Sequence, residues 1–167
     1  MFKTFISILL FCSLPVLALN TNVNLPSASD YSSSILKEHS GIVPWKTLAE
    51  VKFVKKDNVI SQEFSKNILD LDNTETMIQG FMIPLDMGDK QQHFLITAVP
   101  AHCQFCLPAG PEAIVEVNAS YPVSYSFEPI ILIGKFIIVK NDSSGVLYRM
   151  SNAKKVELIY NNLGIME

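Results

Sequence analysis

One short segment of the sequence combines residue types that could do chemistry, His102-Cys103-Gln104-Phe105-Cys106. Thiolates and imidazoles act as nucleophiles, redox groups and metal ligands. The Cys-x-x-Cys spacing brings the two sulfurs close together without a long connection. Pro100, Pro108 and Pro111 flank the pair and restrict the backbone, because each proline ring fixes φ. We therefore expect a stiff loop with both sulfurs on one side.

Three interpretations of this loop stay open. A Cys103–Cys106 disulfide would stiffen a partner-binding loop, although loop entropy makes so short a bridge worth only about 2 kcal/mol. Alternatively, the two thiolates bind zinc or Cu(I), with a third ligand from His102, His93 or Glu112. The third interpretation is thiol–disulfide exchange. It usually needs a thiolate at a helix N-terminus, whereas the flanks here are strand and proline.

The histidines differ in their suitability as the third metal ligand. Neighbouring side chains of an extended segment point to opposite faces, so His102 joins Cys103 only if the turn begins at His102. Otherwise His93, on the strand that enters the loop, is the better donor. The sequence has no phosphate loop, nucleophile elbow or paired-carboxylate motif. We therefore expect a non-enzymatic protein, with thiol redox activity left open.

The elements that must position this loop are strands. From Thr76 onward the apolar residues alternate or run continuously, and β-branched types dominate. Interior glycines at Gly80 and Gly134 are typical of bulges, bends or close backbone approach. These features predict a mainly β fold, a small five-stranded barrel like the oligonucleotide/oligosaccharide-binding (OB) type. The expected strands are Met77–Ile83, His93–Thr97, Ala113–Val117, Ile130–Val139 and Val146–Met150, the last extended past Ala153.

The remaining chain divides into three parts. Residues 1–18 have one lysine, an apolar run and the ending Val16-Leu17-Ala18, which predicts a secretory signal cleaved after Ala18. Residues 19–44 are rich in Ser, Asn and Pro and predict a flexible arm, with one short helix capped by Ser33 or Ser34. Residues 45–160 are expected to form the single barrel domain. The mature protein would be periplasmic, without stable membrane insertion.

Charge excludes two classes of partner. The 167 residues carry a formal net charge of −3 and no basic run. Nucleic-acid binding and attraction to anionic lipid both need a cluster of Lys and Arg. We therefore expect neither partner.

Several blocks of the sequence resemble domain of unknown function family 3299, small exported bacterial proteins. The likeness runs from about Trp45 to Val139 and includes a Cys/Pro loop. In many members a histidine follows the first Cys of that loop by two residues. This chain has Phe105 there and adds Cys106, so it resembles the Cys-x-Phe-Cys branch, and Cys106 would replace that histidine as a ligand. The matching blocks are Trp45–Leu48, Gly80–Leu85, Phe94–Ile96, Cys103–Pro111 and Ile114–Val117.

The resemblance implies no enzyme activity. Some members look like periplasmic companions of zinc-responsive transport systems, which implies an envelope ABC-type transporter component as a partner. The sequence thus leads to an exported binding or accessory protein that takes a transition metal through the Cys103/Cys106 loop. The alternatives are a structural interaction domain with a Cys103–Cys106 disulfide and a thiol–disulfide oxidoreductase.

Overall fold

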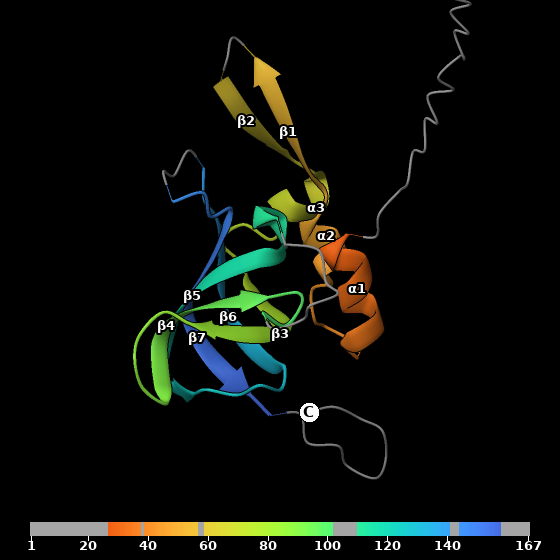
Figure 1. The fold of residues 1–167 in the computed structure, drawn as a ribbon. Coiled ribbons are helices and arrows are strands. Elements are labelled where there is room, and N and C mark those ends of the chain that lie inside the picture. The colour runs from red at the N-terminus through yellow and green to blue at the C-terminus, as the bar shows by residue number, and fades with distance from the viewer. Residues whose placement is uncertain (1–26, 38, 57–58, 102–109, 141–143, 158–167) are drawn as a thin grey trace, which may run out of the picture.

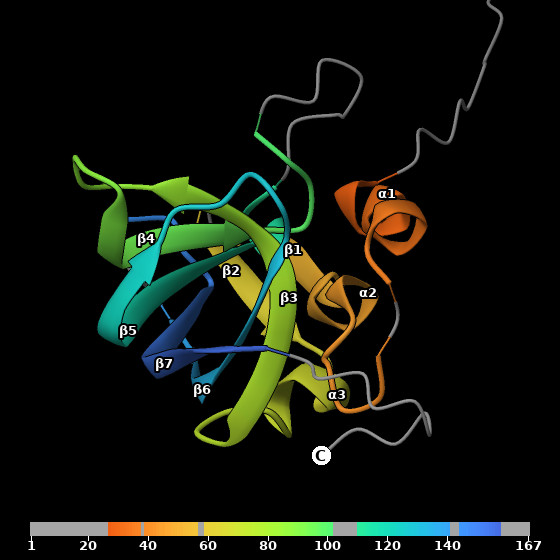
Figure 2. The same cartoon turned by 90° about the horizontal axis from the view of Figure 1, so that it is seen from below.

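The β-rich half of the chain forms a closed barrel in a computed structural model, which describes residues 27–37, 39–56, 59–101, 110–140 and 144–157. The strand order around the barrel is β3-β4-β5-β7-β6, and all neighbours are antiparallel except the parallel pair β5 and β7. Figure 2 shows how the strands wrap around one another. The five strands are β3 (Glu75–Pro84), β4 (Lys90–Thr97), β5 (Ile114–Ser124), β6 (Ile130–Ile138) and β7 (Tyr148–Val156).

This architecture confirms the predicted mainly β fold with a five-stranded OB-like barrel. Alternate side chains of each strand point inward, and burial along β3 follows that period of two. The interior is filled by large apolar side chains, which fixes the register of each strand because a one-residue slip would expose them. Fully buried examples are Ile78, Phe94, Leu132, Phe136 and Tyr148.

The two interior glycines lie where other backbone atoms come too close for a side chain. A Cβ on Gly134 would lie 2.8 Å from Cγ of Met150 and 2.9 Å from the carbonyl oxygen of Ser151. The pairing of β6 with β7 also shifts register at this point, so a β-bulge and close backbone approach, two of the features that an interior glycine indicates, occur together at Gly134. A Cβ on Gly80 would lie 2.6 Å from the carbonyl oxygen of Thr97.

The α-helices of the described residues are short and lie beside the barrel (Figure 1): α1 (Ala28–Ile35), α2 (Trp45–Leu48) and α3 (Lys66–Leu69). Ser27 caps α1 through a reciprocal capping box with Asp30, so the predicted cap at Ser33 or Ser34 was wrong. Of the segment predicted as a flexible arm, Ala28 is buried in the core and Leu36 and Val43 pack against the core, while residues 19–26 lie outside the described residues. Within the described ranges, no helix is long and apolar enough to cross a membrane.

A hairpin that the sequence analysis missed stands apart from the barrel (Figure 1). It consists of β1 (Val51–Lys56) and β2 (Val59–Phe64), which form their own two-stranded sheet. Val51 and Phe64 pair at its base and pack against the core. Farther out on the same face, Phe53 and Ile60 are exposed. The hairpin is therefore anchored at one end only.

A buried glutamine organises the turn between β3 and β4. Gln91 is fully buried, and its side-chain amide nitrogen donates to the carbonyls of Asp86 (3.0 Å) and Gly88 (2.7 Å). Its amide oxygen accepts from the backbone N–H of Asp86 at 3.2 Å. The polar turn is thus closed around one side chain, which satisfies backbone groups that water would otherwise have to reach.

Candidate functional site

The loop that carries His102, Cys103 and Cys106 leaves the barrel at the end of β4. It returns through the 3-10 helix η1 (Pro111–Ala113) into β5. The backbone N–H of Ala98 donates to the carbonyl of Ala113 at 3.1 Å, so the two ends are held side by side by a continuation of the β4–β5 ladder. Residues 102–109 lie outside the described residues. The disulfide, metal and redox interpretations therefore stay predictions.

Exposed aromatic side chains flank the first end of this loop. Tyr125 and Phe127 pack edge to face with ring centroids 5.1 Å apart. With Pro100–Ala101 they line a shallow cleft of about 20 Å³, together with Phe81 and Met82 of β3. Tyr125 is 37% exposed and Phe127 is 70% exposed. Apolar aromatic area is thus presented to solvent directly beside the start of the cysteine loop.

The Tyr125 side of this cleft is fixed by a backbone contact. The N–H of Tyr125 donates to the carbonyl of Asp89 at 2.8 Å, which joins the β5–β6 connection to the β3–β4 turn. The side chain of Gln91 holds that β3–β4 turn together through its hydrogen bonds to Asp86 and Gly88. The aromatic pair is therefore held in place by hydrogen bonds, although it lies in the β5–β6 connection and not in a strand.

The second end of the loop carries a carboxylate, Glu112. Its oxygen atoms turn back toward Gly110 so closely that a Cβ on this glycine would collide with them. The negative charge of Glu112 also acts on Tyr148. Burial raises the pKa of the Tyr148 phenol, and repulsion from the Glu112 carboxylate raises that pKa further. The phenol stays protonated and donates to the carbonyl of Leu48 at 2.6 Å. Glu112 is the predicted ligand that lies at the base of the loop.

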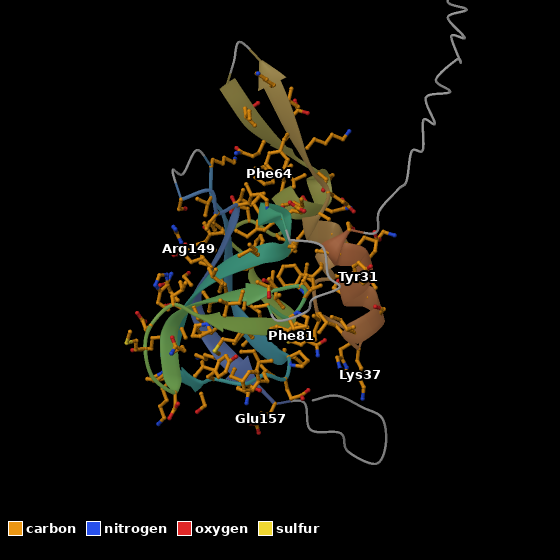
Figure 3. All side chains as sticks on the ribbon, viewed as in Figure 1. Tyr31, Lys37, Phe64, Phe81, Arg149 and Glu157 are labelled. Carbon is orange, nitrogen blue, oxygen red and sulfur yellow. The ribbon has the colours of Figure 1, made fainter. Side chains whose placement is uncertain are left out.

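The other predicted ligand, His93, has partners on the outer wall of the barrel. Its Nε2 donates to Oε1 of Glu116 on β5 at 2.7 Å. Arg149 on β7 contacts Oε2 of the same carboxylate through Nε at 2.8 Å and a terminal nitrogen at 2.7 Å. Three adjacent strands are thus linked by one carboxylate, and Figure 3 places Arg149 on the side of the barrel away from α1.

This cluster was not foreseen, because its members lie far apart in sequence and meet only across paired strands. The one usable signal is that Glu116 and Arg149 each stand between two buried apolar residues of their strand, and the two residues are paired across β5 and β7. Within the described residues, no group of three His, Cys, Asp or Glu side chains could hold a metal ion. The role of His93 as a third ligand stays a prediction, because Cys103 and Cys106 lie outside those residues.

The electrostatics of the cluster stabilise an ionised Glu116. Partial burial raises its pKa, but the hydrogen bonds from His93 and Arg149 and their charges outweigh that effect, so the net pKa lies below the usual value. A carboxyl group with a lowered pKa in the folded state stabilises the protein above the pKa of the unfolded chain. This contribution is lost as the pH falls through the folded pKa.

We expect Glu116→Gln to lower stability at pH 7 by up to about 1 kcal/mol, since His93 and Arg149 are partly exposed and solvent screens them. The difference from wild type should shrink as the pH falls below about 4, because the unfolded glutamate takes up its proton there while the folded Glu116, with its lowered pKa, does so only at lower pH. Denaturant unfolding at pH 7 and pH 3.5 measures it. Glu128→Gln, an exposed carboxylate, is the control. An equal loss at both pH values would contradict the assigned charge effect.

The family can now be assigned from the extent of the match. The family described as "Protein of unknown function (DUF3299)" matches residues 27–157, which run from the cap of α1 to the end of β7. The chain belongs to the DUF3299 family. The resemblance stated from the sequence for about Trp45 to Val139 is confirmed, and the match extends beyond these bounds to take in α1 and β7. DUF3299 membership itself assigns no activity.

A crystal structure of a DUF3299 family protein from Pseudomonas aeruginosa PAO1 is similar to this chain. The two share 21% sequence identity with a TM-score of 0.45, over 59% of this chain and 70% of the other. No curated protein matches the sequence.

Proposed function

We propose that the protein is an exported, non-enzymatic interaction module, in which the cysteine loop and the aromatic residues at its base hold a protein partner. The observation that carries this proposal is the exposed pair Tyr125 and Phe127 beside Pro100–Ala101. Aromatic side chains are enriched in the central contacts of protein interfaces because they bury much area with few rotatable bonds.

Stiffness of the loop supports the same proposal. The three prolines and a Cys103–Cys106 disulfide would limit the conformations of the free loop, so less entropy is lost when a partner binds. The frame at its base, the bond from Ala98 to Ala113, adds to this effect. A small disulfide has little value for global stability, which favours a local role in contact.

The compartment and partner belong to the same proposal. The secretory pattern of residues 1–18 supports export to the periplasm, where disulfides persist. The family resemblance supports an envelope ABC-type transporter component as the partner. The net charge and the lack of a basic run support a protein partner over nucleic acid or anionic lipid.

Site-specific photo-crosslinking in cells tests the proposal. A photoreactive amino acid at Phe127 of the full chain should yield one defined product with an envelope protein, and the periplasmic protein should begin at Leu19. The same probe at Lys66, an exposed residue of α3 that forms an ion pair with the C-cap residue Asp70, is the matched control. The product should weaken in Cys103→Ser. No product at Phe127, or the same product at Lys66, would overturn the proposal.

Transition-metal binding is a second candidate, favoured by the position of Glu112 at the end of the loop. A carboxylate together with two thiolates suits zinc, for which three protein ligands and a water complete a tetrahedral site. Thiolates must lose their protons to bind the metal, so the affinity should fall at lower pH.

We expect reduced wild type to bind zinc or Cu(I) far more tightly than Cys103→Ser and Cys106→Ser, by at least about tenfold for each lost ligand contact. Titration of His102→Ala, His93→Ala and Glu112→Gln then names the third ligand. Equal, weak binding by all variants would contradict the metal site. The disulfide-stiffened contact loop would then be the remaining interpretation. A disulfide that reductant opens readily, with a thiolate that titrates near neutral pH, would instead support thiol exchange.

A further inference from the structure

A pocket separate from the cysteine loop lies between α1 and the chain that leads into α2. Its volume is about 190 Å³, and its apolar wall includes Leu36, Val43 and Trp45. A dry cavity of about 150 Å³ is large enough for benzene. The pocket therefore suits a ligand with one ring or a short branched chain.

The wall of this pocket is held in place by backbone pairing with β3. The N–H of Val43 donates to the carbonyl of Met77 at 2.8 Å, and Ile42 forms an isolated parallel bridge with the same residue. The indole N–H of Trp45 donates to the carbonyl of Gln79 at 2.8 Å. The flat indole surface is thus fixed at the pocket, while most of the side chain is buried in the core.

The polar groups of the pocket favour an anion. Lys37 and His39 line it, and among the described residues none of those lining it is acidic, although the whole chain has a net charge of −3. Figure 3 shows Lys37 near the lower end of α1. Ser33, also in the lining, donates its hydroxyl to the carbonyl of Ser29 at 3.2 Å. The positive charge at the rim suits a negatively charged group, and the apolar surface inside suits an apolar body. The pocket therefore favours an amphipathic ligand.

We propose that this pocket binds a small carboxylate whose apolar body is one ring or a short branched chain. The body contacts Leu36, Val43 and the indole of Trp45, and the ammonium group of Lys37 binds the carboxylate. A charge-assisted hydrogen bond gives both affinity and orientation. This inference is independent of the proposed contact surface, because no described residue lines both this pocket and the cleft at Tyr125 and Phe127.

Trp45 makes the proposal directly testable, because it is the single tryptophan of the chain. We expect 3-methylbutanoate and benzoate to change its fluorescence in a saturable manner, with 3-methylbutanamide and benzamide binding more weakly. Lys37→Gln should weaken the binding of both carboxylates by about tenfold, the effect of losing a hydrogen bond to a charged group. The same substitution should leave the affinity for the two amides unchanged.

Two variants complete the experiment. Lys90→Gln changes an exposed lysine in β4 and should behave as wild type. Ser33→Phe places an aromatic ring at an exposed position of the lining and should remove the fluorescence response while circular dichroism stays unchanged. No saturable response to either carboxylate would overturn the proposal. So would equal affinity for acid and amide, or unchanged carboxylate affinity in Lys37→Gln.

Discussion

Gly134→Val should destabilise the barrel by about 3 kcal/mol, the upper end of the usual cost of forcing extra volume into a packed site. The new Cβ would meet the carbonyl oxygen of Ser151 at 2.9 Å and Cα of Ala153 at 3.0 Å. Both are backbone atoms of β7, so they cannot move aside as a side chain would. For a domain of this size we expect a fall in the melting temperature of about 10 °C.

Thermal unfolding followed by circular dichroism measures this effect. Gln92→Val is the matched control, because it places the same side chain at an exposed position of β4. It should melt within a few degrees of wild type. If Gly134→Val also melts like wild type, the bulge between β6 and β7 tolerates a side chain and the reason given for this glycine is wrong.

Tyr148→Phe should cost about 1–3 kcal/mol, the range for leaving a buried polar group without its partner. The Tyr148 hydroxyl donates to the carbonyl of Leu48 at 2.6 Å, and this bond is buried. It ties β7 to the last residue of α2, 100 positions earlier in the chain. The ring itself, which packs 5.4 Å from that of Phe136, is kept in the variant.

Tyr121→Phe is the control, since Tyr121 is 70% exposed. Water can supply any hydrogen bond that is lost with its hydroxyl group. Urea unfolding of both variants gives the two free energies of unfolding. An equal, small effect for the two would mean that the bond to Leu48 contributes nothing beyond an exposed hydroxyl. A larger effect for Tyr148→Phe would show that the barrel and α2 are energetically coupled.

The barrel could be predicted because its signals are local. Continuous β-branched runs such as β6, and glycines that interrupt them, follow directly from strand geometry. The β1–β2 hairpin lacked those signals: Phe53 and Ile60 are exposed, and Lys52 and Glu63 alternate with them across the pair. Its position is set by Val51 and Phe64 at the base, which pack on a core formed by residues far away.

The candidate site could be predicted only in part. The cysteine loop and its place after β4 follow from the sequence, because the residue types stand together. Tyr125 and Phe127 do not, since aromatic residues are most often buried and nothing local indicates that these lie beside Pro100. The same limit applies to Glu116, whose contacts with His93 and Arg149 require the register of three strands.

The place of β7 in the ring has a consequence for how the protein reaches its folded state. This last strand pairs with both β5 and β6, and its contact with β5 is the parallel one. Until residues 148–156 are present, β5 and β6 each keep an unpaired edge, which is prone to pair with other chains. The pairing of β5 with β7 is non-local, because β6 lies between these strands in the sequence, and non-local pairings form more slowly than local ones. The barrel therefore closes only when β7, the last strand of the described residues, is in place, and the unpaired edges of β5 and β6 persist until then.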